Sequence, residues 1–161
     1  MNQTSILPQI LEWMPFVLQG FGLNILMSLM AIAIGTAIGT FLGFGQLSPS
    51  MAVGGPSKLA TQLFRNAPWL VLLFYCIFLI PYQVNIAGIT IQLPSWLRAT
   101  IGFSFPVAAN FSEIVRGSVN SVPRGQWEAA EALGYSRRAT LFRIILPQCI
   151  TRMVPPWMRS E

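Results

Sequence analysis

The hydrophobic residues of the chain are gathered into long stretches that carry almost no charge. Residues 13–57 contain no charged side chain, and neither do residues 66–97. A helix needs about 20 residues to cross a hydrocarbon layer of about 30 Å, because it rises about 1.5 Å per residue. The pattern therefore predicts membrane-crossing helices over about residues 16–43, 57–80 and 96–119.

The first predicted span has a stripe of small residues. Gly35, Gly39 and Gly43 follow one another at a spacing of four, and Ala31 lies one step earlier. Residues at this spacing share one face of a helix, and small side chains there allow another helix to approach closely. We interpret this face as a general packing surface.

The second predicted span is interrupted by polar residues and by proline. Its apolar core, residues 69–80, is too short to cross a bilayer alone. A helix from Ser57 to Ile80 is long enough, but it then contains Arg65 and Pro68. Proline removes a backbone donor, so we expect a bend at Pro68. In lipid, such a break is tolerated only against other helices or a water-filled cavity.

The third predicted span is polar for a membrane helix, and Ser95 is a candidate for its N-cap. Its polar residues include Ser104, Asn110, Ser112, Glu113 and Arg116. A helix of this composition cannot face lipid on all sides, so we expect it in the interior of a bundle. Side chains such as Ser104 and Asn110 are expected to form hydrogen bonds to a neighbouring helix.

The polar segment over residues 121–147 predicts two short helices. Gly134 suits the position just after the first helix, where a left-handed backbone is common. Ser136 suits the N-cap of the second helix, and Pro147 is expected to end that helix.

The distribution of lysine and arginine predicts the orientation in the membrane. Six of the ten basic residues lie in this segment or at its edges: Arg116, Arg124, Arg137, Arg138, Arg143 and Arg152. Because cytoplasmic loops are enriched in basic residues, the segment is expected to be cytoplasmic. A turn predicted over residues 46–57 then also lies inside. The N-terminus and a loop predicted over residues 81–94 lie outside.

The composition excludes several classes of function. Charged residues make up 9% of the chain, against about 25% in an ordinary soluble domain, and there is no His or Asp. Cys76 and Cys149 are far apart in the sequence, so we expect no disulfide framework, metal site or cofactor, and we read both as small apolar residues. Twelve of the fifteen charges lie in residues 98–161, which is typical of a membrane protein with a polar loop rather than a nucleic-acid-binding protein.

The polar segment also contains a motif. Glu128-Ala129-Ala130 is followed by three residues, Gly134, nine residues and Ile144-Ile145-Leu146-Pro147. Every fixed position of the EAA signature of ABC importer permease subunits is present, and the chain resembles this family.

Three further stretches resemble the polar amino-acid uptake class of that family, the histidine, glutamine and arginine type. They are Glu113-Ile114-Val115-Arg116-Gly117, Val122-Pro123-Arg124-Gly125-Gln126 and Arg65-Asn66-Ala67-Pro68. The resemblance implies an all-α, polytopic transmembrane helix bundle with a cytoplasmic coupling-helix loop. Family members have five spans, whereas this chain provides three and the start of a fourth in a single transmembrane domain, 1–161. We therefore expect it to be truncated at its C-terminus.

The resemblance implies a permease subunit of an ATP-driven importer in a bacterial inner membrane. Its implied partners are a cytoplasmic ATPase dimer, a second permease subunit that is identical or homologous, and a periplasmic binding protein that delivers the amino acid. The chain has no phosphate-binding Gly-x4-Gly-Lys loop, so it is not expected to be an enzyme and ATP hydrolysis belongs to the partner. The alternatives are a pore or secondary transporter subunit not coupled to ATP, or a membrane enzyme.

Two groups of site residues follow from the resemblance. The ATPase-coupling loop is assigned Glu128, Ala129, Ala130, Gly134, Ile144, Leu146 and Pro147. The translocation path or gate is assigned Arg65, Pro68, Asn110, Glu113 and Arg116. Simpler roles remain open, namely an ion pair between Glu113 and Arg116 one helical turn apart, and an Arg65 side chain that reaches the inner interface.

Overall fold

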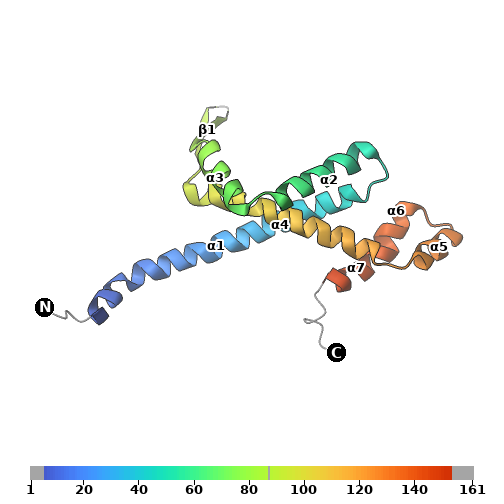
Figure 1. Cartoon of the computed structure of the whole chain (residues 1–161), viewed down its shortest axis with the longest axis horizontal. Coiled ribbons are helices and arrows are strands. Elements are labelled where there is room, and N and C mark those ends of the chain that lie inside the picture. The colour runs from blue at the N-terminus through green and yellow to red at the C-terminus, as the bar shows by residue number, and fades with distance from the viewer. Residues whose placement is uncertain (1–5, 87, 154–161) are drawn as a thin grey trace.

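The computed structural model describes residues 6–86 and 88–153, which form an elongated, mainly helical molecule (Figure 1). The elements are α1 (Ile6–Gln46), α2 (Met51–Asn66), α3 (Trp69–Leu79), β1 (Gln83–Ile86), β2 (Ile89–Gln92), α4 (Ser95–Asn120), α5 (Arg124–Ala132), α6 (Arg137–Thr140), the π-helical turn η1 (Leu141–Ile145) and α7 (Leu146–Met153). The start of a fourth span, expected near the C-terminus, falls mostly outside the described residues.

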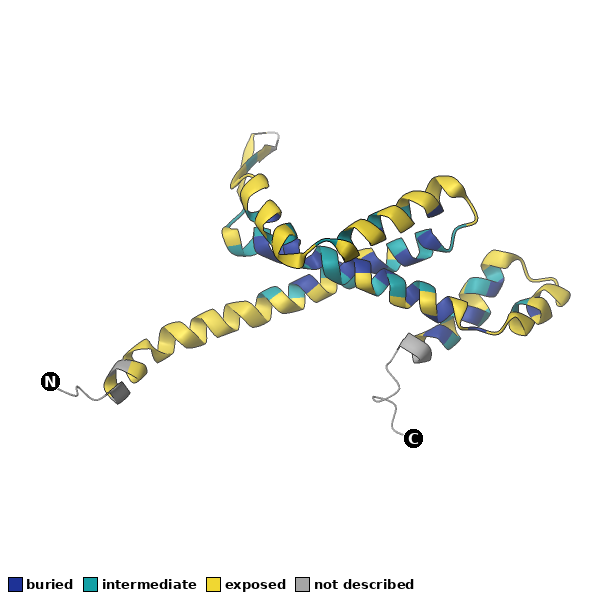
Figure 2. Ribbon diagram, in the orientation of Figure 1, coloured by how far each residue is buried: buried dark blue, intermediate teal, exposed yellow. Residues whose placement is uncertain are grey.

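Helix α1 extends along the molecule, and only its C-terminal part packs against other elements (Figure 2). There it crosses α4, and the small-residue stripe makes the contact. A β-carbon added to Gly35 or to Gly43 would lie 2.6 Å from the β-carbon of Val107 or Val115, respectively. The predicted packing face is therefore confirmed, and α4 is the helix that uses it.

The second predicted span is broken into two helices rather than bent within one. Helices α2 and α3 make an angle of 101° at the break between Asn66 and Trp69. Neither Ala67 nor Pro68 has a helical backbone, since their ψ angles are 136° and 123°. Proline disfavours the α conformation in the residue before it, which accounts for the break. Helix α2 also begins at Met51, so the predicted turn is shorter than expected.

In the described part of the chain, α1 alone is long and apolar enough by itself to cross a membrane. The bent pair α2 and α3 passes the same test only if the two helices are counted as one span. Helix α4 has the predicted extent, but it does not qualify because polar residues interrupt its apolar surface.

The expectation of an all-α chain is wrong for the segment between α3 and α4. Strands β1 and β2 form an antiparallel hairpin there, with Val84 paired to Ile91. Gly88 has φ of 86° in the tight connection, a conformation that glycine adopts without strain. The hairpin stands at the end of α3 (Figure 1).

Arg98 of α4 fixes the end of α3 beside this hairpin. Its Nη1 donates to the carbonyl oxygens of Ile77 at 2.6 Å and Ile80 at 3.1 Å, and its Nη2 donates to Ser95 Oγ at 3.0 Å. The guanidinium thus satisfies carbonyl groups that a helix leaves unpaired at its C-terminus. It also lies 5.9 Å from the centre of the Tyr82 ring.

Three local expectations for α4 are wrong. Pro94 occupies the N-cap, and Ser95 is the first helical residue. Ser104 Oγ and Asn110 Nδ2 donate to carbonyl oxygens of α4 itself, at 2.6 Å and 2.9 Å, rather than to a neighbouring helix. Short polar side chains readily reach the carbonyl three or four residues back, and here this local bond prevails.

Pro147 does not end its helix. It is the second residue of α7, which continues directly from η1. In η1 the Leu146 N–H donates to the Leu141 carbonyl, five residues earlier, so the turn is one residue wider than an α-helical turn. Proline has no N–H to donate, and the wider turn accommodates this loss without breaking the helix.

The C-terminal helices pack on the end of α4 around a small apolar core. Its buried members are Val119, Val122, Ile145 and Cys149. Cys149 is fully buried here and Cys76 is buried in α3, which agrees with their predicted role as small apolar residues.

Candidate functional site

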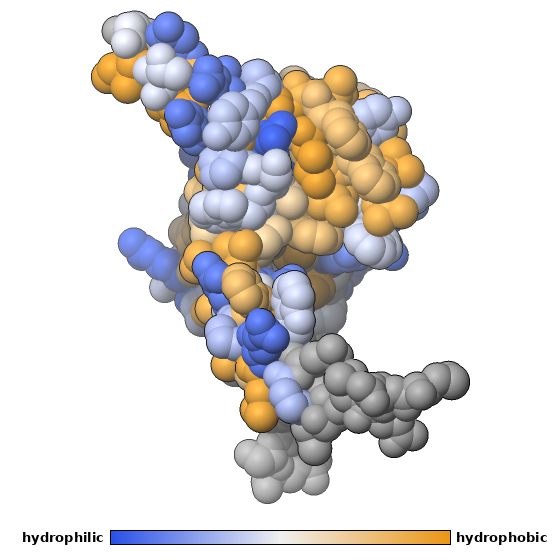
Figure 3. All heavy atoms as spheres, turned by 90° about the vertical axis from the view of Figure 1, so that its left-hand side faces the viewer, coloured by the Kyte–Doolittle hydropathy of each residue, from blue (hydrophilic) through white to orange (hydrophobic). Residues whose placement is uncertain are grey.

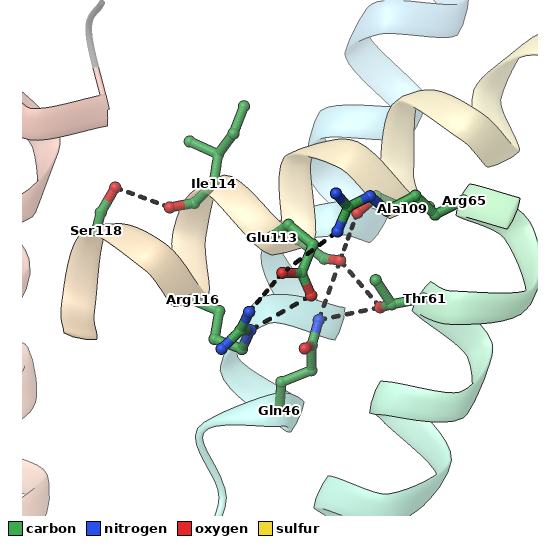
Figure 4. Close-up of polar contacts among 9 residues, drawn as sticks. Gln46, Thr61, Arg65, Ala109, Glu113, Ile114, Arg116 and Ser118 are labelled. Atoms are coloured by element: carbon green, nitrogen blue, oxygen red, sulfur yellow. Dashed lines mark hydrogen bonds and ion pairs between the residues drawn. The ribbon is translucent and has the colours of Figure 1, made fainter. Parts of the chain in front are cut away.

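Three helices meet at a buried polar junction that consists of Gln46, Thr61 and Ser112 (Figure 4). Gln46 Nε2, at the end of α1, donates to Thr61 Oγ1 of α2 at 3.0 Å and to Ser112 Oγ of α4 at 3.1 Å. The two hydroxyl groups lie 3.0 Å apart, and Ser112 Oγ also donates to the Ala109 carbonyl. Each buried polar group therefore has a partner, and the junction fixes the mutual position of α1, α2 and α4.

An ionic cluster of Arg65, Glu113 and Arg116 lies next to this junction. Arg116 donates to both carboxylate oxygens of Glu113, from Nη2 at 2.6 Å and from Nε at 3.3 Å. Arg65 Nη1 of α2 lies 3.7 Å from Glu113 Oε2. The Glu113 side chain is 23% exposed and the Arg65 side chain 54%, so the cluster borders solvent-accessible space.

A cavity of about 220 Å³ opens beside the junction and the cluster. It is lined by Gln46, Lys58, Gln62, Glu113 and Arg116. Glu113 is the single acidic group in this lining, against two basic groups. The cavity is thus polar and carries net positive charge, and it suits a carboxylate or another small anionic group better than a cation.

The structure brings together three of the five residues assigned to the path. Arg65, Glu113 and Arg116 form the cluster, and the helical ion pair expected as the simpler role of Glu113 and Arg116 is present. Asn110 is exposed and bonded to the Pro106 carbonyl, and Pro68 caps α3 at the break in the second span. Neither belongs to the cluster.

Sequence reasoning missed Gln46 and Thr61 as site residues and treated Ser112 only as a polar position in α4. A signal was present, because Thr61 lies one helical turn before Arg65 and Ser112 lies beside Glu113. Gln46 is the first strongly polar residue after the small-residue stripe. The sequence did not indicate that the end of α1 packs against α2 and α4 at these positions.

The loop that carries the EAA signature is built on a glycine turn. Gly134 follows α5 with φ of 80°. Its N–H donates to the Glu131 carbonyl at 2.9 Å, and the Tyr135 N–H donates to the Ala130 carbonyl at 3.1 Å. These two bonds are those of a Schellman C-cap, which requires the left-handed backbone of Gly134. The sequence prediction for this glycine is confirmed.

The second helix of the loop begins as expected. Ser136 Oγ accepts from the Ala139 N–H at 3.4 Å, so Ser136 is its N-cap. Ile144 packs against the apolar core, Leu146 is half-buried and Pro147 is exposed.

Helix α5 turns part of its surface towards solvent. Glu128 and Ala129 are exposed, whereas Ala130 is buried. Trp127 packs against the apolar core and anchors the helix. A glutamate and a small residue are thereby presented on a short helix held at one end of the molecule, away from α3 and the hairpin (Figure 1).

The sequence of residues 35–158 matches a protein family described as the inner membrane component of binding-protein-dependent transport systems. The probable amino-acid ABC transporter permease YckA of Bacillus subtilis is 39% identical over 146 residues, which cover 91% of this chain and 62% of the relative. The glutamate/aspartate import permease GltK of Escherichia coli O6:H1 is 33% identical over 157 residues, which cover 94% of this chain and 67% of the relative.

A solved structure has the same fold. The crystal structure of an amino acid ABC transporter with histidines matches 95% of this chain and 68% of its own chain, with a TM-score of 0.76 and 21% identity. This chain spans 62% and 58% of the lengths of YckA and of the permease y4tF of Sinorhizobium fredii. The match to the family extends over most of the chain and includes the ionic cluster and the glycine turn. The chain therefore belongs to the family of inner membrane components of binding-protein-dependent transport systems.

Proposed function

We propose that the chain is a membrane-spanning permease subunit of an ABC importer for polar amino acids. A periplasmic binding protein delivers the amino acid, a second permease subunit completes the path, and a cytoplasmic ATPase dimer supplies the energy. YckA and GltK are described as amino-acid permeases, which supports this substrate class.

The observation that carries the proposal is the surface of α5. The Schellman turn at Gly134 and the anchored Trp127 hold a short helix whose Glu128 and Ala129 are exposed. A small residue allows close approach of a partner, and a carboxylate can pair with a basic group on it. We assign α5 to the ATPase groove. The position of α5 in this groove is maintained by the other residues of the coupling loop, namely Gly134, Ile144, Leu146 and Pro147.

We further propose a single transmembrane domain with three spans and the N-terminus in the periplasm. The first span is α1, the second is the broken pair α2 and α3, and the third is α4. Broken helices occur in membranes where they line a cavity or pack on protein, and α3 does pack on α4. The polar helix α4 then lies inside the bundle, and α5, α6 and α7 lie on the cytoplasmic side.

The ionic cluster is assigned to the cytoplasmic end of the translocation path. Arg65 comes from α2, whereas Glu113 and Arg116 come from α4, so relative movement of the two helices changes the Arg65–Glu113 contact. Such a contact can act as a gate. Pro68 and Asn110 are assigned to the path itself, Pro68 because it sets the break in the second span.

Reconstitution in liposomes tests the function. The chain, reconstituted with its second permease subunit and with the ATPase subunit and binding protein of its own organism, is expected to take up labelled glutamine, histidine, arginine or glutamate only when ATP is supplied inside. Uptake without the ATPase or without ATP would contradict the proposal and indicate a pore or a secondary transporter subunit.

Cysteine labelling tests the topology. In a variant with Cys76 and Cys149 replaced by alanine, a cysteine is introduced at Ser136 or at Thr90, both of which are exposed. A membrane-impermeant maleimide on intact cells is expected to label position 90 and spare position 136. The opposite pattern would mean that the orientation is inverted.

A further inference from the structure

A second cavity, of about 480 Å³, lies where the end of α1 meets the loop helices. Its lining combines two arginines with aromatic and aliphatic side chains. Arg137 and Arg138 come from α6, Phe44 from α1 and Phe142 from η1. The rings of Phe44 and Phe142 lie 5.8 Å apart in a tilted arrangement.

The two arginines carry charge that no residue of the described ranges neutralises. Arg137 and Arg138 are exposed, and neither forms an ion pair or a side-chain hydrogen bond with another residue in the described ranges 6–86 and 88–153. Elsewhere, Arg116 and Arg98 have side-chain partners. An adjacent pair of free guanidinium groups beside a cavity favours an anion with several oxygen atoms, such as a phosphate.

The remaining lining favours an apolar chain. Phe44, Leu47, Leu141 and Phe142 provide carbon surface within the same cavity. Farther along α1, Phe41 is 78% exposed, and the described side chains towards its N-terminus are mostly exposed and apolar (Figure 2). Phe41 lies three residues before Phe44 on α1, so exposed apolar surface of this helix begins beside the cavity and extends towards its N-terminus, which suits contact with lipid chains. Figure 3 looks along the molecule from that N-terminal end and shows hydrophobic side chains among those that face the viewer.

We propose that this cavity binds an anionic phospholipid of the cytoplasmic leaflet. The phosphate lies against Arg137 and Arg138, and the first part of an acyl chain lies along Phe44 and Phe142. Ser48, in the turn after α1, lines the same cavity and can donate its hydroxyl to the phosphate. The inference rests on the proposed topology, because that topology places the cavity at the inner membrane surface.

Charge and shape together distinguish this ligand from others. A free phosphate would use the arginines but not the aromatic pair, and a neutral lipid would use the aromatic pair but leave two guanidinium groups unpaired. Basic residues near a membrane surface attract anionic lipid with about 1 kcal/mol each. Two of them correspond to roughly a 30-fold preference for anionic over zwitterionic lipid.

Native mass spectrometry of the full chain, exchanged between dioleoyl phosphatidylglycerol and dioleoyl phosphatidylcholine, tests the proposal. The wild-type chain is expected to retain phosphatidylglycerol preferentially, and the double variant R137Q/R138Q to lose that preference by roughly 30-fold. The matched control is R124Q/R143Q, which removes two exposed arginines of the same segment that do not line the cavity. This control is expected to retain most of the preference.

A third variant tests the apolar half of the site. Phe142→Ala leaves the charge unchanged, and it is expected to weaken retention of phosphatidylglycerol several-fold because acyl contacts are lost. If the arginine double variant does not fold, two measurements still test the proposal. They are the preference of the wild-type chain for phosphatidylglycerol and the weaker retention of this lipid in Phe142→Ala.

Three results would overturn the proposal. They are no wild-type preference, an equal loss in R124Q/R143Q, and unchanged lipid retention in R137Q/R138Q. If the last is accompanied by lost ATPase binding, the arginines are a protein contact. Absence of ATP-driven uptake would contradict the proposed function, but it would not change the result of the lipid-binding measurement.

Discussion

Gly39 of α1 lies directly against the backbone of Ala108 in α4. A β-carbon on Gly39 would stand 2.6 Å from the Ala108 carbonyl oxygen and 2.9 Å from the β-carbon of Phe111. The first of these neighbours is backbone, so it cannot move aside as a flexible side chain can. The separation of the two helices is thus set by the absence of a side chain at position 39.

Gly39→Ala is therefore expected to force α1 and α4 apart and to destabilise the chain by about 1–3 kcal/mol. Thermal unfolding in detergent measures the effect. Gly22→Ala is the matched control, because a β-carbon on Gly22 meets nothing within 4 Å and alanine favours helix. Equal stability of the two variants would mean that the crossing is not tight at Gly39.

Gln46→Ala is expected to destabilise the chain by about 1–3 kcal/mol, because it removes a buried amide that bonds Thr61 and Ser112. Unfolding of Gln126→Ala provides the comparison, since Gln126 is exposed in α5. A loss no greater than in Gln126→Ala would show that the junction adds little to the packing of α1, α2 and α4.

The contact between Arg65 and Glu113 is expected to be weak. A double-mutant cycle with Arg65→Gln and Glu113→Gln should give a coupling energy of about 0.2–1 kcal/mol, because the Arg65 side chain is 54% exposed and the atoms are 3.7 Å apart. Such a weak link suits a contact that opens and closes. A coupling of several kcal/mol would instead indicate a fixed structural brace.

Gly134→Val is expected to cost about 1–3 kcal/mol if the turn is kept, since a β-branched residue is strained at φ of 80°. We expect the loop to rearrange and the ATPase to dissociate while membrane insertion continues. Gly134→Ala should be milder. Co-purification with the ATPase measures the loss.

The control for this position is Gly125→Val. Gly125 lies inside α5, has no neighbour within 4 Å of an added β-carbon and is not among the glycines with positive φ. A Gly134→Val variant that binds the ATPase as well as Gly125→Val does would rule out the coupling role of the turn.

Pro68→Ala is expected to relax the break between α2 and α3, because it restores a backbone donor and lets Ala67 become helical. Uptake in reconstituted liposomes should fall while insertion is unchanged. Pro56→Ala, inside α2, is the comparison. Unchanged uptake in the Pro68 variant would count against a role for the break.

Features that depend on residues close together in the sequence could be predicted from the sequence. The extent of α4, the cap at Ser136 and the turn at Gly134 depend on neighbouring residues, and each was predicted. The angle between α2 and α3 could not be predicted, because a proline interrupts a helix without specifying where the chain continues. The hairpin was missed because alternation over four-residue strands is a weak signal.

In the candidate site, too, contacts within one helix could be predicted, whereas contacts between helices could not. Glu113 and Arg116 are one turn apart in a helix, so their pairing follows from helix geometry. The approach of Arg65 and the junction of Gln46 with Thr61 depend on how the end of α1 packs against α2 and α4. That arrangement is set by close packing of α1 on α4, which no single segment encodes.

The wide turn η1 shows that the number of residues in the EAA signature matters as well as their type. One extra residue in a helix rotates everything after it by about 100° relative to everything before it. Ile145, the last residue of η1, is fully buried two residues before Pro147. The number of residues between Gly134 and Ile145 therefore determines which face of α7 packs on the apolar core. A deletion of one residue within Leu141–Ile145 is a small change in sequence. It would nevertheless rotate α7 so that a different face packs on the apolar core, and a movement of the loop would no longer be passed to α7 in the same way.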